Sequence, residues 1–149
     1  MSLKFKTLTP RKEDGEQTWY LIDGTGQTVG RLAAFISETL RGKHRPDYAP
    51  HVNFNIHVVV TNTKDLVFTG NKMKTQKYYR HTGYPGGIRE ATAQQLQEKK
   101  PGEILVHAVR GMVPHNRLGR ALMKNLRIFP GPDHNHAAQL PVPLDVRTR

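Results

Sequence analysis

The chain of 149 residues contains no cysteine, which excludes a disulfide-stapled scaffold and a cysteine-ligated zinc site. It has no stretch that approaches the roughly 18 consecutive apolar residues of a membrane-spanning helix. Residues 1–10 lack the hydrophobic core of a secretion signal, and the acids at Glu13, Asp14 and Glu16 argue against a transit peptide. We therefore expect a cytoplasmic protein.

Acidic residues are scarce: Asp and Glu total 12 against 23 for Lys and Arg, which gives a formal net charge of +11. Such an excess is typical of proteins that bind a polyanion, because a free protein with this charge repels itself. A membrane surface is the competing polyanion, but no apolar span supports it. The length suits one domain with a moderate core and some segments outside that core.

Acids are missing from residues 71–89, which combine five cations, three tyrosines and a histidine and close on a Pro-Gly-Gly turn. Cations can lie along a phosphate backbone, aromatic rings can stack on exposed bases, and glycines allow close backbone approach. The segment has too few aliphatic residues for a core, so we expect a loop that is mobile in the free protein. Tyr79, Arg80 and His81 should form the centre of its RNA contact. A solvated basic loop is the alternative, which this coincidence of residue types disfavours.

A second basic stretch has helical periodicity. Leucines recur every four residues at positions 118, 122 and 126, and cations lie on the opposite side of the helical wheel. We expect one helix over residues 117–127 that docks by its leucines and presents a phosphate-binding ridge: Arg117, Arg120, Lys124 and Arg127. The alternative is an ordinary amphipathic surface helix, although no acid occurs between Glu103 and Asp133.

A third basic cluster follows the first predicted helix and comprises Arg41, Lys43, His44 and Arg45. Cations near the end of a helix are favourable through the helix dipole alone, so this explanation and RNA binding stand about equal. The presence of two other basic segments without acids favours RNA binding.

Hydrophobic patterns predict an α/β body. Residues 19–22 form a first strand, residues 23–26 a turn, and residues 29–41 a helix with one apolar face at a period of about 3.6 residues. The β-branched run within residues 56–61 is continuous, as in a strand of a parallel sheet that is covered on both faces. Residues 66–68 are a further short strand candidate. Strand, helix and strand in this order predict a βαβ unit.

The second half of the chain is more helical. We expect a short polar helix over residues 92–100 and another that starts at Pro101, with apolar residues on one side: Ile104, Leu105, Ala108 and Met112. Residues 1–17 are polar and unpatterned, and the prolines of residues 130–149 predict an extended tail. The predicted organisation is an N-terminal extension, one RNA-binding domain over residues 18–129 and a C-terminal tail.

Three ligand-binding motifs fit poorly. The glycines from Gly24 to Gly30 follow a strand and open a helix, but their spacing is G-x-G-x-x-x-G and no acid ends the second strand, unlike a dinucleotide site. A P-loop fails because Arg31 stands where lysine is needed. His134 and His136 lack a third metal ligand of convincing spacing. The glycines are better explained as a tight turn that leads into a helix, and no catalytic constellation stands out.

A series of short motifs occurs in a characteristic order over about residues 18–145. They are Trp19-Tyr20-Leu21-Ile22-Asp23, Gly30-Arg31-Leu32-Ala33, Leu40-Arg41-Gly42-Lys43-His44, Thr69-Gly70-Asn71-Lys72, Tyr79 to Gly87, Val109 to Pro114, Leu118-Gly119-Arg120 and Gly131 to Gln139. In this order they resemble the universal large-subunit ribosomal protein of the L-thirteen family, in its bacterial form. His115-Asn116-Arg117 departs from the Lys-Gly-Pro that is usual in the family, which keeps charge and changes the turn chemistry.

The resemblance implies a three-layer α/β/α body around a small, mostly parallel sheet, with extended N- and C-terminal segments. It implies a structural constituent of the large ribosomal subunit that binds large-subunit ribosomal RNA, adjoins other ribosomal proteins, and supports early assembly and translation. No catalysis, cofactor or metal is expected. The residues expected at the RNA are Arg31, Arg41, Lys43, His44, Arg45, Lys72, Lys74, Lys77, Tyr79, Arg80, His81, Tyr84, Arg110, Arg117, Arg120, Lys124 and Arg127. A dinucleotide-dependent enzyme and a free RNA-binding regulator are the alternatives.

Overall fold

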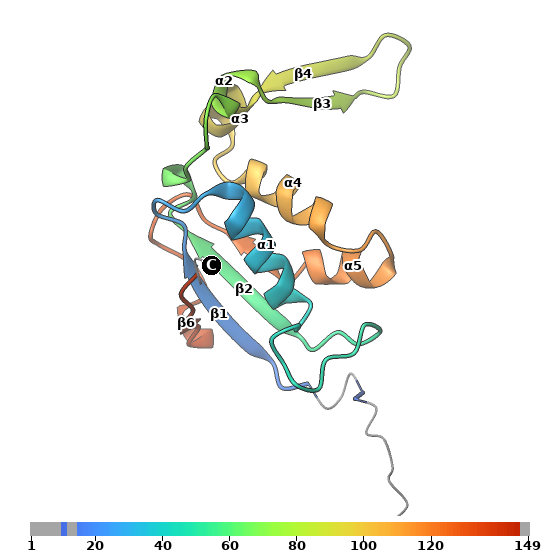
Figure 1. Cartoon of the computed structure of the whole chain (residues 1–149), viewed down its shortest axis with the longest axis vertical. Coiled ribbons are helices and arrows are strands. Elements are labelled where there is room, and N and C mark those ends of the chain that lie inside the picture. The colour runs from blue at the N-terminus through green and yellow to red at the C-terminus, as the bar shows by residue number, and fades with distance from the viewer. Residues whose placement is uncertain (1–9, 12–14, 147–149) are drawn as a thin grey trace, which may run out of the picture.

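The computed structural model describes residues 10–11 and 15–146, so most of the predicted N-terminal extension lies outside the described residues. Its elements follow in the order β1 (Thr18–Asp23), α1 (Val29–Leu40), β2 (Ile56–Thr61), η2 (Thr63–Asp65), α2 (Lys72–Thr75), β3 (Lys77–His81), β4 (Ile88–Thr92), α3 (Ala93–Lys99), α4 (Glu103–Met112), α5 (Arg117–Met123), β5 (Leu126–Ile128), η3 (Ala137–Gln139) and β6 (Val142–Pro143). Figure 1 shows a body around one sheet and a separate hairpin beyond it.

The body is built on a four-stranded sheet in the order β5-β2-β1-β6, and every pairing within it is parallel. The predicted βαβ unit is therefore confirmed, with α1 joining two neighbouring parallel strands. Val58, Val59 and Val60 of the central strand β2 have no exposed surface. This complete burial explains the continuous β-branched run, because a parallel strand covered on both faces has no polar side.

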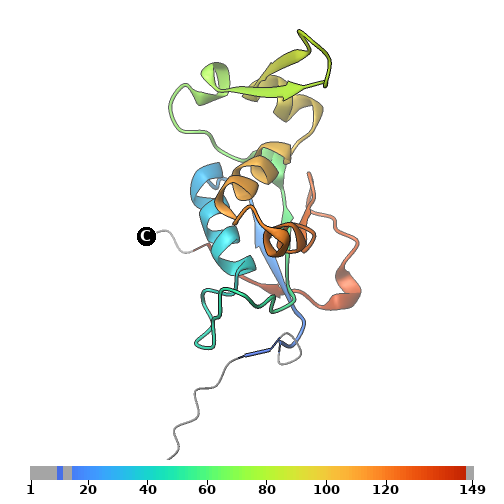
Figure 2. The ribbon, with the colours of Figure 1, turned by 90° about the vertical axis from the view of Figure 1, so that its right-hand side faces the viewer.

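Helices cover one face of the sheet and the C-terminal chain covers the other. Helix α1 packs against α4 and β2, and Leu32, Ile36 and Leu105 are fully buried between them. In Figure 2, α1 and α4 lie to one side of the sheet and the chain after β5, with η3, lies to the other. Trp19 contacts His136 of this chain, with their ring centroids 5.0 Å apart. The arrangement confirms the predicted three-layer α/β body.

The helix predicted over residues 117–127 is too long. Helix α5 ends at Met123, a turn follows, and Leu126 begins β5, which pairs with Val58 of β2. The leucine spacing suggested a continuing helix, and Leu126 is indeed buried, but it lies in a strand. The unpaired edge of β2 decides the outcome, since its backbone groups need hydrogen-bond partners and residues 125–128 supply them.

The short strand predicted at residues 66–68 does not form as an element. Val67 makes only an isolated parallel bridge with Thr28. Its N–H donates to the Gln27 carbonyl (2.9 Å) and its carbonyl accepts from the Val29 N–H (3.2 Å). The segment therefore closes the turn before α1, which leaves a single residue in strand-like pairing.

The loop predicted over residues 71–89 is mostly regular structure. A short helix, α2, precedes β3, and β3 pairs with β4 as an antiparallel hairpin that projects beyond the body in Figures 1 and 2. Helix α3 then begins with a capping box between Thr92 and Gln95. The hairpin formed because two strand-compatible runs flank the glycine-rich turn, although neither run shows apolar alternation. Its mobility in the free protein stays a prediction.

Helix α4 starts at Glu103, two residues after the predicted Pro101, because Gly102 occupies the N-cap in a left-handed conformation (φ 91°). Ile104 and Leu105 are buried as predicted, but Met112 is 44% exposed and Val109 lies in the core. In the predicted C-terminal tail, Val142 and Pro143 pair with β1 at the sheet edge, where proline is tolerated.

Candidate nucleic-acid interface

The β3–β4 hairpin carries the densest set of predicted RNA-binding residues. Residues that pair directly in an antiparallel ribbon share one face, so Tyr79, opposite Glu90, and His81, opposite Ile88, lie on one side. Lys77 lies on the same side and its ammonium is 3.0 Å from the Glu90 carboxylate, which raises the pKa of Lys77 through this hydrogen bond. Tyr79 is 66% exposed, so this face offers an aromatic ring to a partner.

The backbone conformation of the hairpin turn requires glycine at several positions. Gly83 and Gly86 have φ values of 92° and 69°, in the left-handed region that glycine adopts without strain. A Cβ at Gly87 would overlap the Thr82 hydroxyl oxygen. The His81 Nδ1 accepts from the Gly83 N–H at 2.9 Å, so this imidazole braces the turn. Tyr84, 75% exposed, stands at the tip.

A second group of cations surrounds a surface hollow where α4 meets α5. The hollow measures about 230 Å³ and is lined by Arg110, Val113, Pro114, His115, Gly119, Arg120 and Met123. The His115 Nε2 lies 3.2 Å from the Arg110 carbonyl oxygen. Asn116 caps α5, since its side-chain oxygen accepts from the Gly119 N–H at 2.8 Å. His115 and Asn116 thus shape this corner.

The predicted ridge at residues 117–127 is divided. Arg117 and Arg120 are exposed on α5 and Lys124 is exposed in the following turn, while Leu122 is buried on the other side of the helix. Arg127 is on β5 opposite Val59 and so points to the sheet face that carries the C-terminal chain. Arg117, Arg120 and Lys124 therefore lie on α5 or directly after it, while Arg127 belongs to β5 and its guanidinium donates to the Lys124 carbonyl at 2.6 Å.

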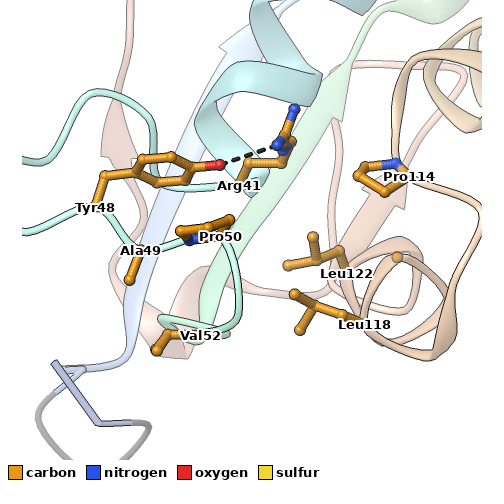
Figure 3. A pocket seen from close by; sticks show the side chains of 9 residues that line it. Arg41, Tyr48, Ala49, Pro50, Val52, Pro114, Leu118 and Leu122 are labelled. Carbon is orange, nitrogen blue, oxygen red and sulfur yellow. Dashed lines mark hydrogen bonds between the residues drawn. The ribbon is translucent and has the colours of Figure 1, made fainter. Parts of the chain in front are cut away.

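Two arginines of the basic cluster at residues 41–45 make contacts within the fold. The Arg41 guanidinium donates to the Tyr48 hydroxyl at 2.9 Å, next to a small cavity that Leu122 of α5 also lines (Figure 3). Arg45 binds both Asp47 carboxylate oxygens at 2.9 and 3.0 Å and lies over the Phe54 ring. Both arginines thereby hold the loop between α1 and β2.

The other predicted residues remain at the surface. His44 lies at the surface with its ring 5.8 Å from that of Tyr20, and partial desolvation of the imidazole, followed by the charge of Arg45, lowers its pKa. Arg31 of α1 is exposed, as are Lys43, Lys72 and Lys74. His44 is therefore suited to hydrogen bonding as a neutral ring, and the lysines to charge pairing.

Arg89 belongs to the basic segment at residues 71–89 but is not among the residues predicted to lie at the RNA. Arg89 lies directly opposite Arg80 in the hairpin register, and both side chains are exposed. The glycine-rich turn between residues 82 and 87 is a signal that could have shown this pairing, because it fixes which residues of the two strands face each other.

The groups that could have formed a dinucleotide or metal site make contacts with other residues of the chain. The Gly24 N–H donates to the Thr61 carbonyl at 3.0 Å and the Gly26 N–H to the Asp65 carbonyl at 3.2 Å, so these donors are already used within the turn. The His134 ring lies 6.3 Å from the Phe129 ring. Among the described residues, no group of three or more potential ligands could hold a metal ion. No helix among the residues that the structure describes is long and apolar enough to cross a membrane.

Comparison with known proteins identifies the family. The family model described as "Ribosomal protein L13" matches residues 17–135. A "Large ribosomal subunit protein uL13" from Lawsonia intracellularis is 50% identical over 141 residues, covering 95% of this chain and 98% of the relative. The protein of the same name from Nitratidesulfovibrio vulgaris (strain Miyazaki F) is 46% identical over 142 residues, with 95% and 99% coverage. The chain therefore belongs to the bacterial type of the Ribosomal protein L13 family, a family of ribosomal constituents rather than enzymes.

Proposed function

We propose that this protein is a structural constituent of the large ribosomal subunit in the cytoplasm, where it binds ribosomal RNA and supports early subunit assembly. The relatives that cover nearly the whole chain carry the name of a large-subunit protein. The observation that supports RNA binding most strongly is the β3–β4 hairpin, which projects from the body with its cations and two of its three tyrosines exposed.

The hairpin should be only marginally stable in the free protein and should be stabilised by bound RNA. A two-stranded ribbon is only marginally stable in water by itself. This one buries few of its own side chains and carries three cations, Lys77, Arg80 and Arg89, with one acid, Glu90. Helix α2, directly before it, adds Lys72 and Lys74. RNA phosphates would neutralise those cations and release counterions, which makes binding favourable and dependent on salt. Tyr79 and Tyr84 would stack on unpaired bases.

The corner between α4 and α5 offers a second RNA contact. Arg110, Arg117 and Arg120 are exposed there, and no ion-pair partner is found for them within the described residues. The hollow beside them provides a concave surface that the apolar side chains of Val113 and Met123 also line. Two basic surfaces on different elements would let the protein join separate RNA segments, as a subunit constituent should.

Salt titration tests the electrostatic part of the proposal. We expect the affinity of the full chain for transcribed large-subunit RNA to fall steeply with salt, with a log–log slope of about 0.7 to 0.9 for each phosphate neutralised and a total magnitude of several. A slope near zero would contradict RNA binding through these cations. Sedimentation of the tagged protein in cells, with large subunits or with messenger RNA, separates the ribosomal role from that of a free regulator.

A further inference from the structure

The register of the hairpin places two arginines together. Arg80 and Arg89 are directly opposite one another in the antiparallel ladder, so their Cβ atoms are roughly 5 Å apart on one face. Both side chains are exposed, and no described acid forms an ion pair with either of them. The acid nearest in sequence, Glu90, points to the other face, where it pairs with Lys77. The arginine face of the ribbon thus carries concentrated positive charge.

Such an arrangement opposes hairpin formation. Like charges directly opposite each other destabilise a strand pair, and a two-stranded ribbon has little stability to spare. An external anion would reverse this effect, because a phosphate oxygen pair matches the planar donor fork of a guanidinium. Two forks at this spacing can hold a single phosphate group between them, while exposed lysines elsewhere act only as point charges.

The position of Tyr78 shows where the phosphate would lie. Tyr78 is on the same face as Arg80, since the two are separated by one residue along β3. Its half-buried ring lies 5.8 Å from the ring of His107 on α4, and burial raises its pKa. The contact between Tyr78 and His107 therefore directs the arginine face toward α4, the helix that lies below the hairpin in Figure 1.

We propose that Arg80 and Arg89 form a two-arginine clamp for one phosphodiester group of RNA, on the hairpin face directed toward α4. This assignment rests on the proposed RNA-binding function and adds Arg89 as a binding residue. The clamp also couples binding to structure: the phosphate removes the repulsion between the two guanidinium groups, so the hairpin is more stable when RNA is bound.

The variant Arg89→Glu tests the clamp because it should change stability and binding in opposite directions. A glutamate opposite Arg80 forms an attractive cross-strand pair, so amide hydrogen exchange across β3 and β4 should become slower in the free full-length protein. The same change removes half of the clamp and repels phosphate. We expect its affinity for transcribed large-subunit RNA to fall roughly ten- to hundredfold.

Lys64→Glu is the matched control, because Lys64 is exposed on η2 and the change in net charge is the same. The clamp is contradicted if both variants lose equal affinity, which would mean that only net charge matters, or if Arg89→Glu accelerates exchange in the hairpin. Weak, salt-independent binding by the unmodified protein would instead overturn the proposed function itself. Wild-type binding with a steep salt dependence and equal variants would overturn the clamp alone.

Discussion

At the scale of single residues, charge alone does not reveal what a basic side chain does. Arg45 and Lys43 lie two positions apart, yet Arg45 is tied to Asp47 whereas Lys43 extends from the surface. The hydrogen bond from Arg45 lowers the pKa of Asp47, which shows that the pair favours its ionised form. Part of the predicted binding cluster is therefore a brace for the loop that follows α1.

Gly119 is the residue whose replacement should disturb the fold most directly. A Cβ at this position would overlap the Pro114 carbonyl oxygen, a backbone atom that cannot easily move. We expect Gly119→Ala to lower the free energy of unfolding by about 1–3 kcal/mol or more, measured by chemical denaturation. Gly111→Ala is the control, because the Cβ there would meet no atom within 4 Å, and alanine favours the helix by about 0.5–1 kcal/mol. Equal effects at the two glycines would show that the contact with Pro114 is unimportant.

At the scale of elements, a helix or strand was predictable where its own sequence pattern determines its conformation. It was not predictable where a segment distant in sequence determines that conformation. Helix α1 and strand β2 were predicted nearly to the residue, since an amphipathic period and a β-branched run are properties of the segment itself. Strand β5 was missed because the edge of β2, which is distant in sequence, recruits it. The hairpin was missed because an exposed ribbon has no buried face, and hence no hydrophobic alternation to detect.

The candidate site was predictable in residue type and only partly in arrangement. The concentration of cations and tyrosines in residues 71–89 was visible in the sequence, and all of them except the half-buried Tyr78 are exposed in the structure. The pairing of Arg80 with Arg89 and the placement of Arg127 on β5 were not visible, because strand register and sheet face depend on backbone pairing across the fold.

Helix α5 should show separate contributions from its two sides. Leu122→Ala removes a buried side chain, so the melting temperature should fall, with a loss of about 2–5 kcal/mol in the free energy of unfolding. The double variant Arg120→Ala with Lys124→Ala removes two exposed cations, so it should keep the melting temperature and bind large-subunit RNA more weakly. Unfolding caused by the charge changes, together with a silent leucine change, would contradict this assignment of faces.

At the scale of the whole molecule, the basic surfaces are spread along the long axis. The hairpin lies at one end, the loop between α1 and β2 lies at the other, and α5 lies between them (Figure 1). The face of the sheet away from α1 and α4 is covered by a cluster of aromatic rings around the one tryptophan of the chain. Trp19 stacks there on His57, with ring centroids 4.3 Å apart. This cluster attaches the C-terminal chain to the body.

Acid should weaken that attachment. Burial lowers the pKa of His57 below its ordinary value of 6.5, and the charges of Arg127 and His136 act in the same direction. The unfolded chain therefore takes up the proton more readily, so the free energy of unfolding should fall as the pH drops from about 7 toward 5. His44, whose pKa is also lowered, contributes with the same sign.

Trp19 gives a direct measurement of this titration, because its fluorescence responds to the charge of the ring stacked on it. We expect a fluorescence midpoint below pH 6.5 that disappears in His57→Gln and persists in His136→Gln. A midpoint at or above 6.5 would show that the imidazole is not desolvated in the folded protein.

The position of β6 also has a kinetic consequence. Strand β1, near the start of the described chain, lies between β2 and β6, and β6 is formed by residues near its end. One edge of β1 can therefore find its partner only after nearly the whole body has been synthesised. Pairing between such distant segments forms slowly, because the chain entropy of closing a long loop must be lost before any contact is gained. On an elongating chain, the βαβ core can assemble first, and the sheet is completed only after residues 142–143 become available.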